Sequence, residues 1–326
     1  MPFDDIIGHE RNLEIFKRSL KAGKLGHAYI FEGVPGSGRK KTALALIQAL
    51  FCKEMDDDAC GICSSCRKVT AGNHGDIHFV EPLPDKRDIS IAQLRDLQRE
   101  LALRPYEAPR KACIMEPAER MNTNSANSFL KTLEEPPGNA IIILLTENAD
   151  ILLPTIRSRC QLIRFAPLSS EHICQLLEKR GLEYASASLM AQMADGSMQK
   201  ALELDNDALN ERRETLLNHI TALSMDKIVT VFDASESLCG NREETLESLD
   251  MLLSIIRDVV HLSVGCGDII NNSIRPTLDQ LVSKLNLENS MQLIDQILET
   301  RRSVQRNANA KLALDHLFMR FASIIA

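Results

Sequence analysis

The chain has 326 residues, of which 44% are hydrophobic and 25% are charged, with 15 glycines and 12 prolines. This composition excludes a disordered, collagen-like or low-complexity chain, and the length predicts two or three domains. The formal net charge of −7 argues against a protein whose whole surface binds nucleic acid. The longest apolar run, at 140–145, is far shorter than the roughly 18 residues of a membrane helix, and no secretory signal is recognisable. We therefore expect a soluble, cytoplasmic protein without membrane contact.

The first half of the chain alternates short β-type runs with helical patterns. Candidate strands are five short runs, at 28–31, 77–80, 112–115, 140–146 and 161–165. Helical patterns lie between them, at 41–51, from Ser90 onward, and at 124–135. Ser90 and Gln93 have capping-box spacing, which predicts that a helix begins there. This alternation predicts a parallel sheet with helices on both faces, an α/β fold.

The composition changes near Pro167, because only one of the 12 prolines follows it. Beyond that point the apolar spacing is helical throughout, which predicts an all-α region after the α/β region. We predict three domains, at 1–166, 167–206 and 207–326. The last of them is interpreted as an interaction or oligomerisation domain, since it carries no chemical motif.

A glycine-rich loop, Gly33 to Gly38, follows the first strand and leads into a helix. In that position the backbone at Gly33, Gly36 and Gly38 can surround a phosphate at the helix N-terminus. The P-loop pattern next requires Lys and then Ser or Thr, but this chain has Arg39 and Lys40. Arg39 could contact phosphate, whereas Lys40 cannot bind Mg²⁺. The loop is therefore a marker of fold, and we expect no productive binding of ATP and Mg²⁺.

The acidic segment expected of a P-loop ATPase is also altered. The strand at 112–115 is followed by Glu116, Pro117 and Glu119, so that proline stands where a general base would be. We interpret the two glutamates as solvated acids beside a turn.

Four of the nine cysteines, Cys52, Cys60, Cys63 and Cys66, lie close together after the loop's helix. Four thiolates at C-x7-C-x2-C-x2-C spacing can enclose a tetrahedral structural Zn²⁺. An iron–sulfur cluster is the rival, although the C-P signature is absent, and a redox dithiol is a weaker alternative. His74 and His78 are interpreted as ordinary loop and strand residues.

Several segments together resemble a known family: 3–8, 26–33, 126–137 and 155–160. They are similar to the AAA+ clamp-loader subunits of bacterial DNA polymerase III, and the resemblance covers residues 3 to about 202. The segment 306–314 also resembles the last collar helix of such subunits. Within the family, the altered phosphate loop indicates a member other than the tau/gamma motor.

The resemblance implies an AAA+ P-loop-like domain with a zinc module inserted at about 52–66, then a helical lid and a helical collar. It implies a complex with the tau/gamma motor subunits and the delta subunit, which opens the sliding clamp and loads it on primed DNA. In that complex this chain would be a stationary platform that does not hydrolyse ATP, and its zinc would be structural.

Arg159 matches the arginine finger of the family, a guanidinium that stabilises the transferring phosphate in a neighbouring subunit. Without the resemblance, Arg159 and Arg157 would be interpreted as surface arginines paired with acids. Gln199 occupies the position of a sensor arginine of active members, and Thr146 and Asn148 match the first sensor segment.

Three functions are compatible with these patterns. The first is the non-hydrolysing scaffold, supported by Arg39, Lys40, Pro117 and Gln199 together with the retained Arg159. The second is an active AAA+ ATPase with an unusual loop. The third is a zinc-dependent DNA-binding module, against which the acidic charge and the absence of Trp argue.

Overall fold

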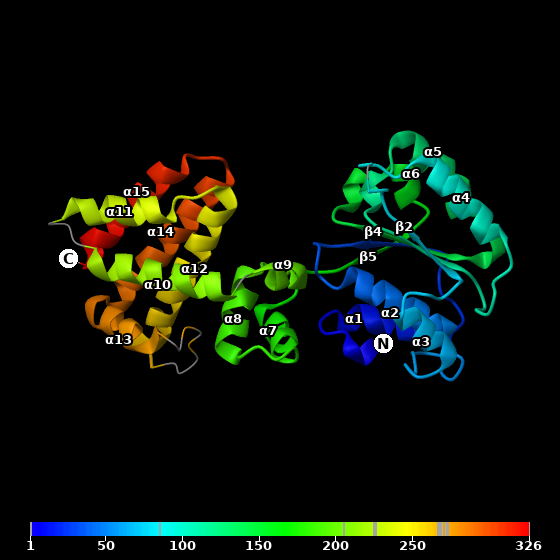
Figure 1. The fold of residues 1–326 in the computed structure, drawn as a ribbon, viewed down its shortest axis with the longest axis horizontal. Helices are drawn as coiled ribbons and strands as arrows, with labels where there is room; N and C mark the ends of the chain where they lie inside the picture. Colours follow the sequence, from blue (N-terminus) through cyan, green and yellow to red (C-terminus); the bar gives the residue numbers. More distant parts are fainter. Residues whose placement is uncertain are drawn as a thin grey trace. The chain divides into compact units, whose positions relative to one another are not determined.

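The structure is a computed structural model that describes residues 2–84, 86–204, 206–223, 227–265, 269, 271 and 274–325. It forms two compact units (Figure 1). The first comprises Met1–Ser169 with Gly196–Gln199, and the second comprises Ser170–Asp195 with Lys200–Ala326.

The first unit is built on a five-stranded sheet of order β2-β3-β4-β1-β5, in which all neighbouring strands are parallel. The strands are β1 (Ala28–Glu32), β2 (Ile77–Val80), β3 (Ala112–Met115), β4 (Ile141–Thr146) and β5 (Gln161–Arg164). All five predicted strands are confirmed, each within one residue at either end. β4 lies at the centre of the sheet, where every residue of its apolar run is buried.

Helices cover both faces of this sheet, as the alternating pattern predicts (Figure 1). Along β4, Ile141, Ile143 and Leu145 belong to one buried cluster, whereas Ile142 and Leu144 belong to another. Successive side chains of a strand point to opposite faces, so each cluster is the core of one face. The helices and 3₁₀ turns are η1 (Phe3–Asp5), α1 (Glu10–Lys21), α2 (Arg39–Phe51), α3 (Ser64–Thr70), α4 (Ile91–Ala102), η2 (Ala118–Arg120), α5 (Thr123–Glu134), η3 (Pro137–Asn139), η4 (Ala149–Ile151) and α6 (Pro154–Arg157).

Helices α4 and α2 begin at residues whose side chains have defined partners or positions. At α4 the capping box is confirmed, because Ser90 Oγ accepts the Gln93 N–H at 3.3 Å and Gln93 Oε1 accepts the Ser90 N–H at 3.0 Å. Helix α2 begins at Arg39, two residues earlier than predicted. Arg39 and Lys40 therefore lie in the first helical turn, directly after the glycine loop.

Beyond Pro167, every regular element in the described part of the chain is a helix, as predicted. These are α7 (Ser170–Glu178), α8 (Tyr184–Met193), α9 (Met198–Glu203), α10 (Asn206–Ala222), α11 (Ile228–Leu238), α12 (Arg242–Ser263), α13 (Arg275–Lys284), α14 (Leu287–Gln305) and α15 (Ala310–Ile325). In the second unit, Arg301 of α14 is 2.6 Å from Asp250 of α12 and 3.5 Å from Asp195 after α8. None of the helices described here is long and apolar enough to cross a lipid bilayer.

Candidate functional site

Helix α2 carries a candidate site at each end, with the glycine loop before it and the cysteine cluster after it. The loop begins where β1 ends, and the Gly33 N–H donates to the Thr146 carbonyl at 3.2 Å. A Cβ on Gly33 would lie 2.5 Å from the Phe165 carbonyl oxygen, so this position accepts only glycine. Gly36 and Gly38 have φ of 75° and 97°, in the left-handed region. The strand–loop–helix geometry of a phosphate loop is therefore present.

The cations that follow the loop are paired within the chain. Arg39 is 6% exposed, donates from Nη1 to the Thr146 carbonyl, and lies 3.8 Å from Glu116 Oε1. Burial lowers the pKa of Arg39, and the carboxylate of Glu116 opposes that shift. Lys40 Nζ is 3.0 Å from Glu116 Oε2 and 2.8 Å from Glu81 Oε1. The charges nearest to the loop therefore neutralise one another.

The interpretation of Glu116 and Glu119 as solvated acids is wrong. Glu116 pairs with Arg39 and Lys40, the first two residues of α2, and Glu119 Oε1 accepts the N–H of Glu147 at 3.3 Å. The physical reason is the parallel sheet, since the carboxyl ends of its strands share one edge. Glu116 follows β3 at the same edge where the loop follows β1.

The chain itself contacts the loop from two directions. The Met198 N–H donates to the Gly36 carbonyl at 3.0 Å. A Cβ on Gly36 would lie 2.5 Å from the Gln199 nitrogen and would also overlap Ser197 Oγ. His9 Nε2 is 2.7 Å from the Ser37 carbonyl oxygen, which only accepts, so that this nitrogen carries the proton. Residues 197–199 and His9 therefore pack directly against the loop.

The four predicted cysteines converge after α2. Their sulfur atoms all lie within 4.8 Å of one another, and Cys60 Sγ is 3.9 Å from Cys66 Sγ. Zinc–thiolate bonds of about 2.3 Å in a tetrahedron separate neighbouring sulfurs by about 3.8 Å. The donor set and its spacing thus fit a metal ion such as zinc.

Backbone N–H groups point at the same sulfurs. The N–H of Cys60 donates to Cys52 Sγ at 3.4 Å, that of Cys63 to Cys60 Sγ at 3.3 Å, and that of Cys66 to Cys63 Sγ at 3.4 Å. Burial would raise the pKa of Cys63, but N–H donors from Lys53 and Cys66 outweigh it and lower that pKa to about 6. Donors of this kind stabilise thiolates, the form in which cysteine binds metal.

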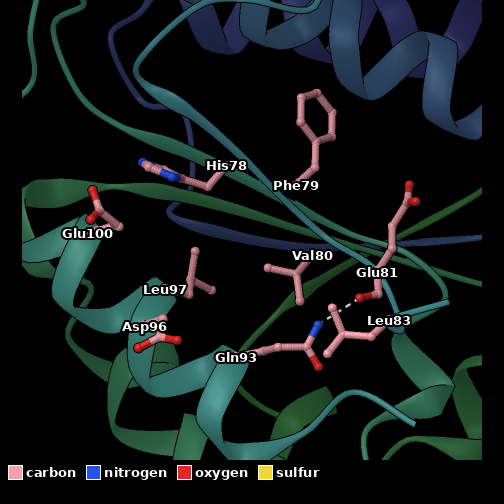
Figure 2. A pocket seen from close by; sticks show the side chains of 9 residues that line it. All are labelled: His78, Phe79, Val80, Glu81, Leu83, Gln93, Asp96, Leu97 and Glu100. Carbon is pink, nitrogen blue, oxygen red and sulfur yellow. Dashed lines mark hydrogen bonds between the residues drawn. The ribbon is translucent and has the colours of Figure 1, made fainter. Parts of the chain in front are cut away.

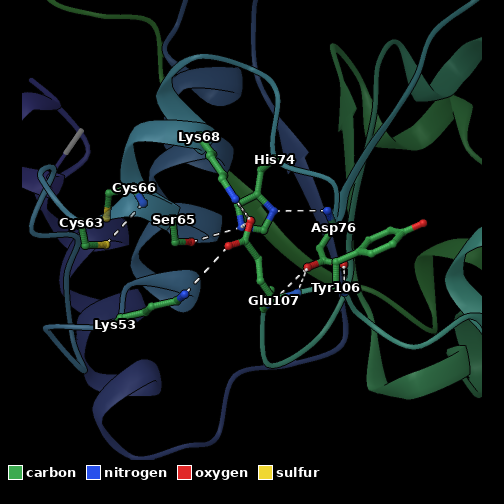
Figure 3. Close-up of polar contacts among 10 residues, drawn as sticks. Lys53, Cys63, Ser65, Cys66, Lys68, His74, Asp76, Tyr106 and Glu107 are labelled. Atoms are coloured by element: carbon green, nitrogen blue, oxygen red, sulfur yellow. Dashed lines mark hydrogen bonds and ion pairs between the residues drawn. The ribbon is translucent and has the colours of Figure 1, made fainter.

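A buried polar network that sequence reasoning missed joins the cluster to the sheet (Figure 3). His74 is not an ordinary loop residue, since its side chain is fully buried and its Nε2 lies 3.2 Å from Ser65 Oγ of α3. Its Nδ1 accepts the N–H of Asp76 at 3.2 Å. Burial lowers the pKa of His74. The only sequence signal was a histidine and an aspartate close behind the cysteine cluster.

Asp76 is the other half of that network. Its Oδ1 accepts the N–H of Tyr106 at 2.7 Å, and its Oδ2 accepts those of Glu107 and Ala108 at 3.0 and 2.9 Å. Burial would raise the pKa of Asp76, but these three donors outweigh it and hold the pKa below its ordinary value. One buried carboxylate therefore fixes the loop ahead of β3.

Arg159 lies just after α6 and is about one-third exposed. Its Nε is 2.7 Å from Glu134 Oε1, its Nη2 also binds that oxygen, and its Nη1 donates to the Thr155 carbonyl at 2.9 Å. Arg157 is 2.8 Å from Asp150. In the single chain both arginines thus pair with acids of their own surface, and the trans role of Arg159 stays a prediction.

A groove of about 580 Å³ lies between edge strand β2 and α4 (Figure 2). Gln93 spans it at one end, where its Nε2 donates to the Glu81 carbonyl at 2.8 Å. His78 lines the groove from β2, as a strand residue should, and burial lowers its pKa. No residue proposed for chemistry from the sequence lines it.

Comparison with known proteins gives consistent matches. Residues 8–169 match the family model described as "DNA polymerase III, delta subunit", and residues 207–323 match "DNA polymerase III, delta subunit, C terminal". The DNA polymerase III subunit delta' of Bacillus subtilis (strain 168) is 32% identical over 317 residues, covering 95% of this chain and 94% of that protein. The subunit delta' of Pseudomonas aeruginosa is 30% identical over 313 residues, covering 91% and 92%.

Another DNA polymerase III subunit, tau, matches over a smaller share of its length. The DNA polymerase III subunit tau of B. subtilis is 27% identical over 270 residues, which cover 80% of this chain but only 47% of tau. The resemblance drawn from the motifs is confirmed, and both relatives that match over more than 90% of their length are delta' subunits. The chain therefore belongs to the delta' family of DNA polymerase III clamp-loader subunits.

Proposed function

We propose that this chain is the non-hydrolysing stator of a clamp-loader complex and supports the loading of a sliding clamp on primed DNA. Its partners would be the tau/gamma motor subunits and the delta subunit, with the clamp and DNA contacted through the complex. The domains would be the AAA+ domain at 1–166, the lid at 167–206 and the collar at 207–326. The observation that carries the proposal is the pairing of Arg39 and Lys40 with Glu116.

That pairing explains why the loop would not turn over ATP. In a working P-loop, Lys contacts the β/γ-phosphates, Ser or Thr binds Mg²⁺, and a nearby acid completes the metal site. Here the ammonium of Lys40 forms an ion pair with Glu116, the acid that would coordinate Mg²⁺. The hydroxyl of Thr42 is not a substitute, because it donates to the carbonyl of Gly38, the residue before α2, at 3.0 Å.

Arg159 would act on a neighbour's ATP. Exposed arginine–carboxylate pairs typically stabilise by only about 0–1 kcal/mol, so Arg159 could leave Glu134 for a triphosphate of higher charge. An arginine supplied in trans raises phosphoryl-transfer rates by roughly 10³–10⁵ in known cases. A subunit with no turnover of its own would then still be required for turnover by the complex.

The cysteine cluster would hold one structural zinc ion. Cys52, Cys60, Cys63 and Cys66 supply four thiolates, which leaves no open coordination position for catalysis. When bound, the ion would cross-link a segment that has little regular structure of its own, and it would add no reaction step.

The test is ATP hydrolysis by the reconstituted complex of this chain with its cognate tau/gamma and delta subunits. Arg159→Ala should lower the rate by at least about tenfold, whereas Arg164→Ala, which removes another exposed ion-paired arginine, should leave it near wild type. Complex assembly is checked by size-exclusion chromatography. An unchanged rate in an assembled Arg159→Ala complex would contradict the trans role.

A further inference from the structure

The cysteine segment, residues 52–66, contacts the first residues of the chain through one buried carboxylate. Asp58, between Cys52 and Cys60, is 6% exposed. Its Oδ1 accepts the N–H of Phe3 at 2.9 Å, and its Oδ2 lies 3.4 Å from Nζ of Lys17 in α1. Buried carboxylates are costly unless paired in this way, so Asp58 is a fixed point between the two segments.

Apolar packing follows the same route. The side chain of Phe3 is 1% exposed and shares a buried cluster with Phe51, Ala59 and Cys66. The partly buried side chains of the other three cysteines pack against that cluster. Burying Phe3 therefore depends on how the cysteine segment is folded.

The segment that begins at Phe3 ends at the opposite end of α2. Lys41 Nζ donates to the Asp5 carbonyl at 2.8 Å, and His9 reaches the Ser37 carbonyl in the glycine loop. The His9 ring also lies edge-on against Phe165, with ring centroids 4.8 Å apart. Residues 3–9 thus connect the surroundings of the cysteines to the glycine loop.

Little in the local chain fixes Asp58 by itself. Residues 52–63 lie outside any helix or strand, so their conformation depends on packing and on the four sulfurs. A metal ion that ties Cys52 and Cys60 to α3 would remove much of the conformational freedom of the residues between them.

We propose that metal binding at the four cysteines fastens the N-terminal segment, residues 2–9, along α2, with Asp58 as the positioning residue. This inference rests on the proposed zinc site and assigns that site a role. The bound ion orders residues 52–60, so that Asp58 is positioned to accept the Phe3 N–H. With Phe3 held there, residues 2–9 place His9 against the glycine loop.

The experiment is hydrogen exchange followed by mass spectrometry on the full chain, with any tag at the C-terminus. Zinc-loaded wild type is compared with chelator-treated wild type under reducing conditions and with zinc-loaded Asp58→Ala. The matched control is Asp56→Ala, which removes an exposed carboxylate from the same segment. Zinc content is measured for each sample, and peptides covering β4 report whether the unit stays folded.

Asp58→Ala should keep about one zinc per chain while exchange in residues 2–9 becomes about tenfold faster, with β4 unchanged. Removing the metal should speed exchange there at least as much, and Asp56→Ala should match wild type. Unchanged exchange in residues 2–9, in Asp58→Ala or in a metal-free chain with β4 still protected, would overturn the proposal. If metal removal also exposes β4, the zinc-loaded Asp58→Ala sample decides. If the wild-type chain binds no zinc, the proposed zinc site itself is wrong, and the measured zinc content shows this separately from the exchange data.

Discussion

The two ends of α2 differ in what they retain. At its N-terminus the glycine loop has the backbone geometry of a phosphate site, but Arg39 and Lys40 are paired with Glu116. At its C-terminus four sulfurs face one another within 4.8 Å. At the N-terminal end, the cations beside the loop are already paired with a carboxylate of the same chain. At the C-terminal end, four sulfur donors converge at distances that fit a metal ion.

The glycines of the loop have a structural role that does not depend on a ligand, because they allow close packing. Gly33 and Gly36 are each close to other protein atoms, so replacing either would cost stability whether or not phosphate binds. The cysteines also pack against the buried core, but apolar packing alone does not require four sulfurs to lie within 4.8 Å of one another. Their convergence is therefore the stronger sign of a ligand.

The largest loss of stability should come from removing one of the four cysteine thiolates at the C-terminal end of α2. Cys66→Ser removes one of four metal donors at a fully buried position, and we expect loss of bound zinc and about 3–5 kcal/mol of unfolding free energy. Cys113→Ser is the matched control, because burial raises the pKa of Cys113 to about 12 and keeps it a protonated thiol in β3. It should keep the zinc. Zinc content and denaturant unfolding measure both, and a Cys66→Ser chain with full zinc would contradict the assignment.

Gly36→Ala tests whether the glycine loop is needed for close packing against Ser197 and Gln199. Gly36 has φ of 75° and a Cβ there would overlap Ser197 and Gln199, so we expect a loss of about 3 kcal/mol. Gly72→Ala shares the strained φ, 70°, but meets no atom within 4 Å and should cost only about 1 kcal/mol. Equal losses in chemical denaturation would show that strain alone, and no close packing, governs Gly36.

Asp76→Asn tests the network that joins the cysteine end to the sheet. An amide presents its NH₂ group to backbone N–H donors that now bind a carboxylate oxygen, so we expect a loss of about 2–3 kcal/mol. Because the folded pKa of Asp76 lies below its ordinary value, this stabilisation is present above about pH 4 and is lost as the pH falls through the folded pKa. Wild type should therefore lose stability on acidification more steeply than Asp76→Asn.

The control for that series is Asp96→Asn, which changes an exposed carboxylate paired with Arg99 on α4. It should alter the free energy of unfolding by less than about 1 kcal/mol. If Asp76→Asn and Asp96→Asn have the same pH dependence, Asp76 does not carry the acid sensitivity.

The smallest effect belongs to the Lys40–Glu116 pair. Lys40 is 46% exposed, so a double-mutant cycle of Lys40→Met and Glu116→Gln should give a coupling energy of no more than about 1 kcal/mol. The Lys40–Glu116 pair would then contribute little to stability, and its effect would be to neutralise the charges beside the loop. A coupling of several kcal/mol would instead make it a structural ion pair.

The sheet and the cysteine site could be predicted from sequence because their signals are local. Apolar runs such as 140–146 identify buried strands, and C-x-x-C spacing brings sulfurs together through a short chain. The pairing of Glu116 with Lys40 could not be predicted in this way, because it joins residues 76 positions apart across the sheet edge. The role of Asp76 was missed for the same reason, since its contacts lie 30–32 residues away.

The most direct test of the central claim is Mg²⁺-dependent ATP hydrolysis by the purified chain alone. We expect a rate at background, because Arg39 and Lys40 beside the loop are paired with Glu116. In addition, Ser197 and Gln199 pack against Gly36 in the loop. Turnover that requires Mg²⁺ and disappears in Arg39→Ala would contradict the account and make this chain an ATPase.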